Sequence, residues 1–162
     1  NMVQALKELI AYGKEKNILV TLEDFDGPVQ PFARMYQLLW FMENVPGLKF
    51  TLDTGNFAYS DEDAVQAYEV LKDYIVHTHA KDGRRNYYRA PEEVYGLVEA
   101  EMLASPSFTE LPLGTGNVDF AAYLKALDEI GYHGFLTVER EVGDTPEKDI
   151  RTAVEFLQKL IR

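Results

Sequence analysis

Short apolar runs alternate with longer amphipathic segments along the whole chain. Apolar residues recur every three or four positions in the longer segments, which predicts helices at residues 2–16, after Pro31, at 65–71, 92–103 and 120–127, and after Thr145. The short runs have the length and composition of buried strands, and they cover residues 18–22, 48–52, 74–80 and 135–138. Strands that alternate with helices predict an α/β fold with a parallel sheet and right-handed crossovers.

The helix boundaries carry signals of their own. Ser60 is expected to cap the helix at 65–71, with Asp63 at the capping-box position. Asn117 is expected to cap the helix at 120–127. Pro146 opens the last helix, at a position where a proline loses no useful hydrogen-bond donor.

Two architectures have this order of elements, an open doubly wound sheet and part of a (β/α)8 barrel. Gly114-Thr115-Gly116 does not follow a strand directly and lacks the third glycine of a dinucleotide-binding fingerprint, so a Rossmann fold with a bound dinucleotide is disfavoured. The sequence shows no low-complexity tract and no close internal repeat. Its length fits a single domain over residues 1–162.

Each predicted strand ends in a side chain that can bind a metal ion; the four are Glu23, Asp53, His79 and Glu139. In parallel sheets and barrels, ligands bind at this C-terminal edge. An acidic residue after a strand also often caps the next helix, and this alternative explains any one of the four positions more easily than all four together. We therefore expect the four side chains to converge in one pocket.

Three carboxylates in one pocket repel one another and take up protons unless a cation neutralises them. A divalent ion removes this conflict, and carboxylate oxygens with one imidazole suit Mn²⁺, Mg²⁺ or Co²⁺, with Zn²⁺ as a further candidate. We take Mn²⁺ as the first choice. Alternation along the third strand places Ile75, His77, His79 and Lys81 on one face. His77 lies one layer deeper and is expected to have a structural role.

Composition narrows the possible partners. The chain carries 16 Lys+Arg against 27 Asp+Glu, a formal net charge of −11, and this surplus of acid argues against nucleic acid as a partner. No run of 18 or more apolar residues occurs, so no membrane span is predicted, and the N-terminus lacks the layout of a signal peptide. Because the sequence has no cysteine, disulfides and thiolate metal sites are excluded, and we expect a cytoplasmic protein.

Five segments around the strand ends and the loop before the helix at 120–127 form a recognisable series: TLEDF (21–25), TLDTGN (51–56), HTHAKD (77–82), GTGNVDF (114–120) and TVERE (137–141). In this order and spacing they resemble the C-terminal half of the xylose-isomerase-like TIM barrels, the sugar-phosphate isomerase/epimerase superfamily that includes the D-tagatose 3-epimerase type. The resemblance runs nearly from end to end. It implies that the fold is half of a TIM barrel, strands five to eight, and that Glu23, Asp53, His79 and Glu139 bind one divalent ion.

The resemblance also implies a function. It implies an isomerase or epimerase acting on a sugar or sugar phosphate through an enediolate, with Glu23 and Glu139 as the acid/base pair on either side of the substrate. It implies substrate contacts at Asn56, where family members often have histidine, and at Arg85, six residues after the metal histidine. Lys81 and Arg85 are expected to anchor hydroxyls or a phosphate, with a solvated charged loop as the alternative.

Three further expectations concern the surroundings of this pocket. Asp82 is expected to orient Lys81 or His79. The long segment 83–112 is expected to form a lid or an assembly surface, with ordinary surface packing as the alternative. Two other functions stay open, a metal-dependent dehydratase of inosose type and a non-catalytic half-barrel module.

Completion of the barrel is the last expectation. A TIM barrel takes roughly 250 residues, whereas this chain has 162. A half barrel leaves two unpaired strand edges and an apolar inner face, which invite association. We therefore expect the missing strands to come from the rest of a longer enzyme of which this chain is a piece, from a second copy in a homo-oligomer, or from a separately encoded N-terminal half-barrel.

Overall fold

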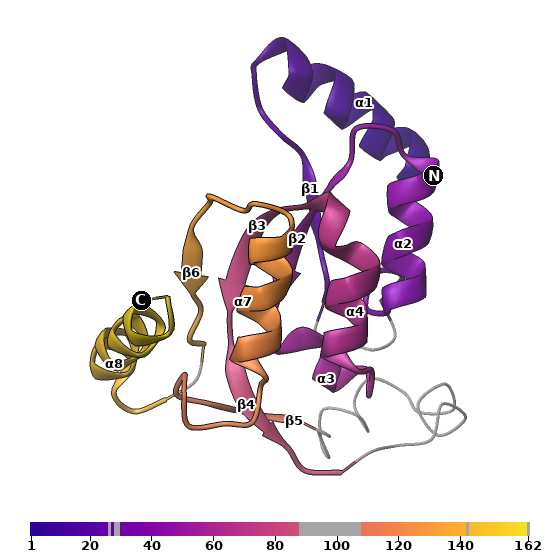
Figure 1. Ribbon diagram of the computed structural model, residues 1–162. Helices are drawn as coiled ribbons and strands as arrows, with labels where there is room; N and C mark the ends of the chain where they lie inside the picture. Colours follow the sequence, from indigo (N-terminus) through magenta and orange to yellow (C-terminus); the bar gives the residue numbers. More distant parts are fainter. Residues whose placement is uncertain (26, 28–29, 88–107, 142, 162) are drawn as a thin grey trace.

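Figure 1 shows the chain as a computed structural model, in which all residues are described except 26, 28–29, 88–107, 142 and 162. The strands are β1 (Thr21–Glu23), β2 (Lys49–Asp53), β3 (Ile75–Ala80), β4 (Asp82–Arg85), β5 (Phe108–Leu111) and β6 (Leu136–Val138). The helices are α1 (Met2–Glu15), α2 (Met35–Asn44), α3 (Asn56–Tyr59), α4 (Ala64–Leu71), the 3-10 helix η1 (Lys72–Tyr74), α7 (Phe120–Glu129) and α8 (Pro146–Leu160). The four predicted strands are confirmed as β1, β2, β3 and β6, although β1 starts later than expected. The helix predicted at 92–103 lies outside the described residues.

The order of strands decides between the two candidate architectures. β1, β2, β3 and β6 form one parallel sheet in that order. The order of these four strands in the sheet is therefore the same as their order along the chain. A doubly wound sheet reverses its strand order at a switch point, whereas a barrel proceeds in one direction. α4 packs between α2 and α7 on one side of this sheet (Figure 1). The fold is therefore an α/β arc of a barrel, as predicted.

The hydrophobic core lies between this sheet and its helices. Phe50 and Leu52 of β2 are fully buried there, against a layer of helical side chains that includes Leu38. Two buried tyrosines keep their hydroxyl groups hydrogen-bonded: Tyr68 donates to the Thr54 carbonyl at 3.4 Å and Tyr123 donates to Thr78 Oγ1 at 2.7 Å. Satisfied hydroxyls let large aromatic rings be buried without loss of a hydrogen bond.

The other face of the sheet carries polar side chains. Thr51 Oγ1 of β2 donates to Thr21 Oγ1 of β1 at 2.8 Å, and His77 Nε2 of β3 lies 3.3 Å from Thr137 Oγ1 of β6. The expectation of an apolar inner face is therefore wrong, because the apolar residues of these strands point towards the helices.

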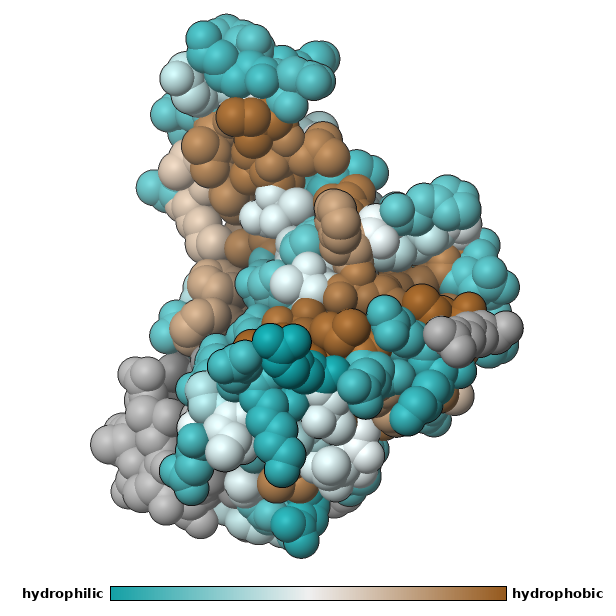
Figure 2. Space-filling view, turned by 90° about the vertical axis from the view of Figure 1, so that its left-hand side faces the viewer, coloured by the Kyte–Doolittle hydropathy of each residue, from teal (hydrophilic) through white to brown (hydrophobic). Residues whose placement is uncertain are grey.

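Exposed apolar side chains lie instead just before the two edge strands. Ile18 and Leu19 precede β1, and Phe135 precedes β6 with 80% of its surface exposed. Apolar surface is also visible on the side of the molecule that carries β6 and α8 (Figure 2). Among the described strands, β1 pairs only with β2 and β6 only with β3. Completion of the barrel stays a prediction.

A bulge in β3 changes the predicted alternation. Phe50 pairs with Ile75, but the next residue of β2, Thr51, pairs with His77, so β3 carries one extra residue between them. Paired residues of neighbouring strands point to the same face, and Ile75 joins Phe50 in the buried core. The prediction that Ile75 shares a face with His77 is therefore wrong. His77 and His79 do share a face, and their rings pack edge to face with centroids 5.2 Å apart.

Two helix caps differ from the predicted ones. Asp63, and not Ser60, caps α4, because its Oδ1 accepts hydrogen bonds from the amides of residues 65 and 66 at 2.9 and 3.3 Å. Asp119, and not Asn117, caps α7, with its Oδ1 accepting from the amide of residue 122 at 2.9 Å. A carboxylate both accepts the free amides and complements the positive end of the helix dipole, which favours aspartate at these positions.

β4 and β5 form a small antiparallel sheet that the sequence pattern does not predict. Asp82, the first residue of β4, is buried and accepts four backbone N–H groups; the donors are Gly83 at 2.7 Å, Gly114 at 2.8 Å, Gly116 at 2.9 Å and Val118 at 3.2 Å. Asp82 thus fastens the loop before α7 to the end of β3. This is a different role from the predicted orientation of Lys81 or His79.

Replacing Gly116 by alanine is expected to destabilise the fold by at least about 2 kcal/mol. A Cβ atom there would lie 2.2 Å from Asp82 Oδ1 and 2.3 Å from the Gly83 carbonyl oxygen, and the carbonyl belongs to the backbone and cannot turn away. Chemical denaturation of the variant measures the loss.

Gly131→Ala is the control for this experiment. No atom lies within 4 Å of a Cβ built at Gly131, but its φ is +62°, so only backbone strain of roughly 1 kcal/mol is expected there. Equal losses in the two variants would contradict the steric role of Gly116.

No described helix combines the length and the hydropathy needed to cross a membrane.

Candidate metal centre

Four strand ends bring their side chains to one place. Glu23 ends β1, Asp53 ends β2, His79 stands next to last in β3 and Glu139 follows β6. Because parallel strands share their C-terminal edge, these residues converge, and one potential ligand atom of each lies within 4.8 Å of the other three. The predicted convergence is therefore found, while the role of the four as metal ligands stays a prediction.

The spacing of these atoms fits a single ion. His79 Nδ1 lies 2.7 Å from Glu23 Oε1 and 2.8 Å from Glu139 Oε2. An imidazole nitrogen donates at most one proton, so it cannot satisfy both carboxylates at once. Around an octahedral ion with bonds of about 2.1 Å, neighbouring ligand atoms are about 3 Å apart. The observed distances suit a set of ligands around a common cation.

Asp53 presents one oxygen to this cluster and uses the other for the backbone. Its Oδ1 accepts the amide protons of Gly55 at 2.7 Å and Asn56 at 3.0 Å. Its Oδ2 is buried and has no hydrogen-bond partner among the described residues. The Lys81 ammonium lies 3.6 Å from this oxygen, an ion-pair distance that is too long for a hydrogen bond. A buried carboxylate oxygen without a hydrogen-bond donor is costly unless a cation meets it at close range, so the site suits a metal ion at this oxygen.

Asp24 lies behind this aspartate and was not singled out from the sequence. It is fully buried, and its Oδ1 accepts the Asp53 amide proton at 2.8 Å. Burial, followed by the charge of Asp53, holds the pKa of Asp24 well above its usual range. Only its position directly after Glu23 at a strand end could have indicated it.

The predicted substrate-binding residues are divided by the structure. Asn56 and Lys81 are buried beside the cluster, and Lys81 Nζ donates to Asn56 Oδ1 at 3.2 Å. Arg85 lies on β4 and donates to Asp61 Oδ1 at 3.2 Å and to the Glu62 carbonyl at 2.9 Å. Those two partners precede α4 rather than belonging to the cluster.

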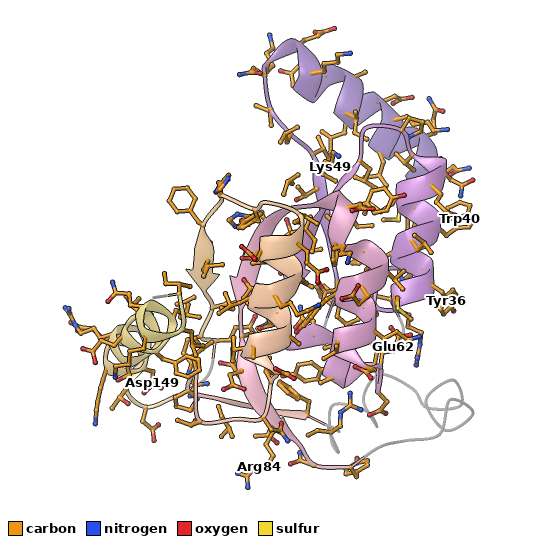
Figure 3. The ribbon with its side chains drawn as sticks, viewed as in Figure 1. Tyr36, Trp40, Lys49, Glu62, Arg84 and Asp149 are labelled. Atoms are coloured by element: carbon orange, nitrogen blue, oxygen red, sulfur yellow. The ribbon has the colours of Figure 1, made fainter. Side chains whose placement is uncertain are left out.

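Lys81 and Arg85 are not part of a solvated charged loop, which was the alternative to substrate binding. Lys81 is only 2% exposed, and the Arg85 side chain is 10% exposed. Its neighbour Arg84 is the exposed one of the pair, and it points away from the protein (Figure 3). The charged stretch after β3 is thus mostly folded into the protein.

Charges within the cluster shift its acidities in opposite directions. Burial raises the pKa of Asp53 to about 7, even though the Lys81 ammonium acts against it. Burial by itself would raise the pKa of Glu139. The hydrogen bond from Lys81 and the neighbouring positive charges outweigh this effect, so the net pKa of Glu139 is lowered. Near neutral pH, Glu139 is therefore ionised, whereas Asp53 retains a proton more readily than an ordinary aspartate does.

Affinity for a divalent ion is expected to fall by up to about tenfold for each pH unit below about 7. The ion binds the ionised carboxylate, and below its pKa of about 7 the Asp53 carboxyl must lose a proton first. Isothermal titration with Mn²⁺ at several pH values measures the slope. An affinity that stays constant between about pH 7 and pH 5.5 would contradict the raised pKa, since an ordinary aspartate is ionised throughout that range.

Comparisons with known proteins agree with this geometry. The sequence profile of the xylose isomerase-like TIM barrel family matches residues 1–160. An inosose dehydratase from Clostridium perfringens (strain 13 / Type A) is 32% identical over 145 residues, which cover 86% of this chain and 46% of that protein. The rhizopine catabolism protein MocC from Rhizobium meliloti is 39% identical over 95 residues, 59% of this chain and 28% of that protein. The chain thus spans about half the length of the curated relatives it matches, or less.

Solved structures are similar over nearly the whole chain. A xylose isomerase domain protein from Planctomyces limnophilus superposes with a TM-score of 0.73 at 28% identity, covering 98% of this chain and 50% of that one. The IOLI protein, solved with a bound zinc atom, superposes with a TM-score of 0.72 at 20% identity, covering 98% and 54%. At that identity the second likeness concerns the fold.

Proposed function

Because this chain belongs to the xylose isomerase-like TIM barrel family, we propose that it carries the metal centre of an enzyme that acts on a polyhydroxylated carbonyl compound. The observation that supports this most is the convergence of Glu23, Asp53, His79 and Glu139 at one strand edge. These four residues would hold one divalent ion, with Mn²⁺ as the first candidate and Mg²⁺, Co²⁺ or Zn²⁺ as the others. When bound, the ion supplies Lewis-acid stabilisation for negative charge on a carbonyl oxygen of the substrate.

Dehydration of an inosose is the reaction we place first. The support is the 32% identity to an inosose dehydratase over 86% of the chain. For this reason we propose the dehydratase, which the sequence left open as an alternative, ahead of the isomerase or epimerase. In this reaction the bond between a hydrogen and the carbon next to the carbonyl breaks. The hydroxyl on the following carbon then leaves with a proton as water, and a carbon–carbon double bond forms.

In this proposal two glutamates move those protons. Glu139, which Lys81 keeps ionised, takes the proton from carbon on one of its carboxylate oxygens. Glu23 supplies the proton that leaves with the hydroxyl, and its side chain is 37% exposed, so it can recover a proton from water. Each transfer of this kind contributes roughly 10²–10⁴-fold to the rate.

Epimerisation of a ketose or its phosphate is the second candidate. It uses the same removal of a proton by one glutamate, but the other glutamate returns a proton to the same carbon from the opposite face. Glu23 and Glu139 support it because they come from the first and last strands of the sheet and flank His79. Aldose–ketose isomerisation moves the proton to the neighbouring carbon instead.

Metal analysis and product analysis together test the proposal. Plasma mass spectrometry of protein purified without chelator is expected to find about one divalent ion per chain. Mass spectrometry of the reaction products then separates the two reactions, because dehydration loses one water and epimerisation leaves the mass unchanged. A chain that binds no ion even when Mn²⁺ is added would leave the non-catalytic half-barrel module as the better description.

A further inference from the structure

The ammonium group of Lys81, a residue buried beside the acidic cluster, reaches into the cluster. Its Nζ lies 2.8 Å from Glu139 Oε1 and 3.6 Å from Asp53 Oδ2, two of the four residues that converge. It also lies 3.2 Å from Asn56 Oδ1 and 3.5 Å from Glu141 Oε1. An ammonium group has three donors, and these four acceptors are enough to occupy all of them.

The rest of the side chain is fixed as well. Thr54 Oγ1 donates to the Lys81 carbonyl at 2.5 Å and accepts from the Lys81 amide at 2.8 Å, so the backbone is held on both sides. The aliphatic stem passes directly over Gly55, where an added Cβ would lie 3.0 Å from Lys81 Cγ. Because the side chain is only 3% exposed, the ammonium cannot swing into solvent without opening this packing.

We propose that the Lys81 ammonium is a built-in counter-cation of the metal centre, which holds Glu139 and Asp53 in their ligand positions and lowers the affinity of the site for a divalent ion. This inference rests on the proposed metal centre. The Lys81 ammonium donates a hydrogen bond to Oε1 of Glu139, so only Oε2 of this glutamate faces the cluster, 2.8 Å from His79 Nδ1. Glu139 is thereby directed to bind an ion through one oxygen.

The lowered affinity follows from charge. A positive charge a few ångströms from Asp53 Oδ2 repels any cation that this oxygen binds, and the repulsion is strong because the Lys81 and Asp53 side chains are only 3% and 0% exposed. In the ion-free protein the same charge offsets part of the repulsion among the carboxylates. Lys81 is therefore a positioning residue, in contrast with the substrate-anchoring role expected from the sequence.

Calorimetric titration of Mn²⁺ into the chelator-treated 162-residue chain tests this inference. Lys81→Met is expected to bind Mn²⁺ at least tenfold more tightly than the unchanged protein at the same pH. Lys125→Met is the matched control, because Lys125 lies on the outer side of α7 with 67% of its side chain exposed, and its affinity should stay unchanged. Binding of equal or lower strength in Lys81→Met would overturn the inference. A complete lack of binding by the unchanged chain would instead overturn the proposed metal centre.

A spectrum tests the positioning role separately. In the Co²⁺ complex, the visible absorption bands report the number of ligand atoms around the ion. Loss of the Lys81 hydrogen bond should let both oxygens of Glu139 reach the ion and change these bands, whereas a lysine that only supports the fold would leave them as they are. If Lys81→Met is unfolded without metal, circular dichroism should show that Mn²⁺ restores its fold, because the ion replaces the missing charge. A variant that stays unfolded at saturating Mn²⁺ would contradict the inference.

Discussion

Replacing Glu139 by glutamine is expected to lower turnover by roughly 10²–10⁴-fold at saturating metal ion, the usual contribution of an acid/base group. Glutamine keeps the size of the side chain and an oxygen that can bind an ion, but it cannot take a proton from carbon. Turnover is measured with an inosose and, in parallel, with ketoses. Turnover within about tenfold of the original, with the ion still bound, would show that Glu139 is not the base.

Glu141→Gln is the matched control for this variant. Glu141 lies two residues along the same segment and contacts the same ammonium, with its Oε1 3.5 Å from Lys81 Nζ. Its side chain is 53% exposed, and it is not one of the four converging residues. The same chemical change there is expected to alter turnover by less than about threefold. A large loss in both variants would indicate a general effect of charge on Lys81 rather than proton transfer by Glu139.

The sequence predicts the converging residues well because their placement depends on topology. Once four strands are recognised as parallel, their C-terminal ends must share an edge, and the residues at those ends must lie near one another. One potential ligand atom of each of Glu23, Asp53, His79 and Glu139 does lie within 4.8 Å of the other three. No detail of side-chain packing was needed for this step. The choice between a barrel and a doubly wound sheet, in contrast, depends on strand order, which local patterns do not contain.

Features that depend on a single residue of register or on distant contacts were not predictable. The bulge that places Ile75 in the core has no signal in an apolar run, because every residue of such a run can face either side. Arg85 matches a family position by counting from His79, but β4 turns it towards Asp61 and Glu62. Counting along the chain assumes a common path of the backbone after the strand, and a loop need not keep it.

The polar character of the inner face of the sheet was not predictable from composition either. Hydrophobic composition suggested that this face is apolar and must be covered. The strands instead alternate, with threonines and histidines on the inner face and apolar residues towards the helices. We therefore expect any drive to complete the barrel to come from the edges of β1 and β6, which have no further partner among the described strands, and from exposed residues such as Phe135, rather than from a broad apolar face.

Replacing Asp53 by asparagine is expected to weaken Mn²⁺ binding by at least about 100-fold, because it removes a charged ligand from the centre of the site. The same change is expected to stabilise the ion-free protein at pH values above 7. The pKa of the Asp53 carboxyl is raised on folding from 3.8 to about 7. Its contribution to the stability of the folded protein is therefore largest below pH 3.8 and is lost as the pH rises through about 7. Above that pH the ionised carboxylate opposes folding by up to about 4 kcal/mol, and asparagine cannot ionise.

Loss of the Lys81 contact reduces this gain, so a net stabilisation of roughly 1–3 kcal/mol is expected in denaturation experiments with a chelator at about pH 8. Asp24→Asn is the matched control, since Asp24 is also fully buried with a raised pKa but is not among the four converging residues. It should change ion-free stability in the same direction while leaving Mn²⁺ binding within a few-fold. If both variants lost the ion equally, the ligand role of Asp53 would have no support. If Asp53→Asn destabilised the ion-free protein at high pH, its carboxylate would be well satisfied without a metal ion, and the main sign of a metal site would be lost.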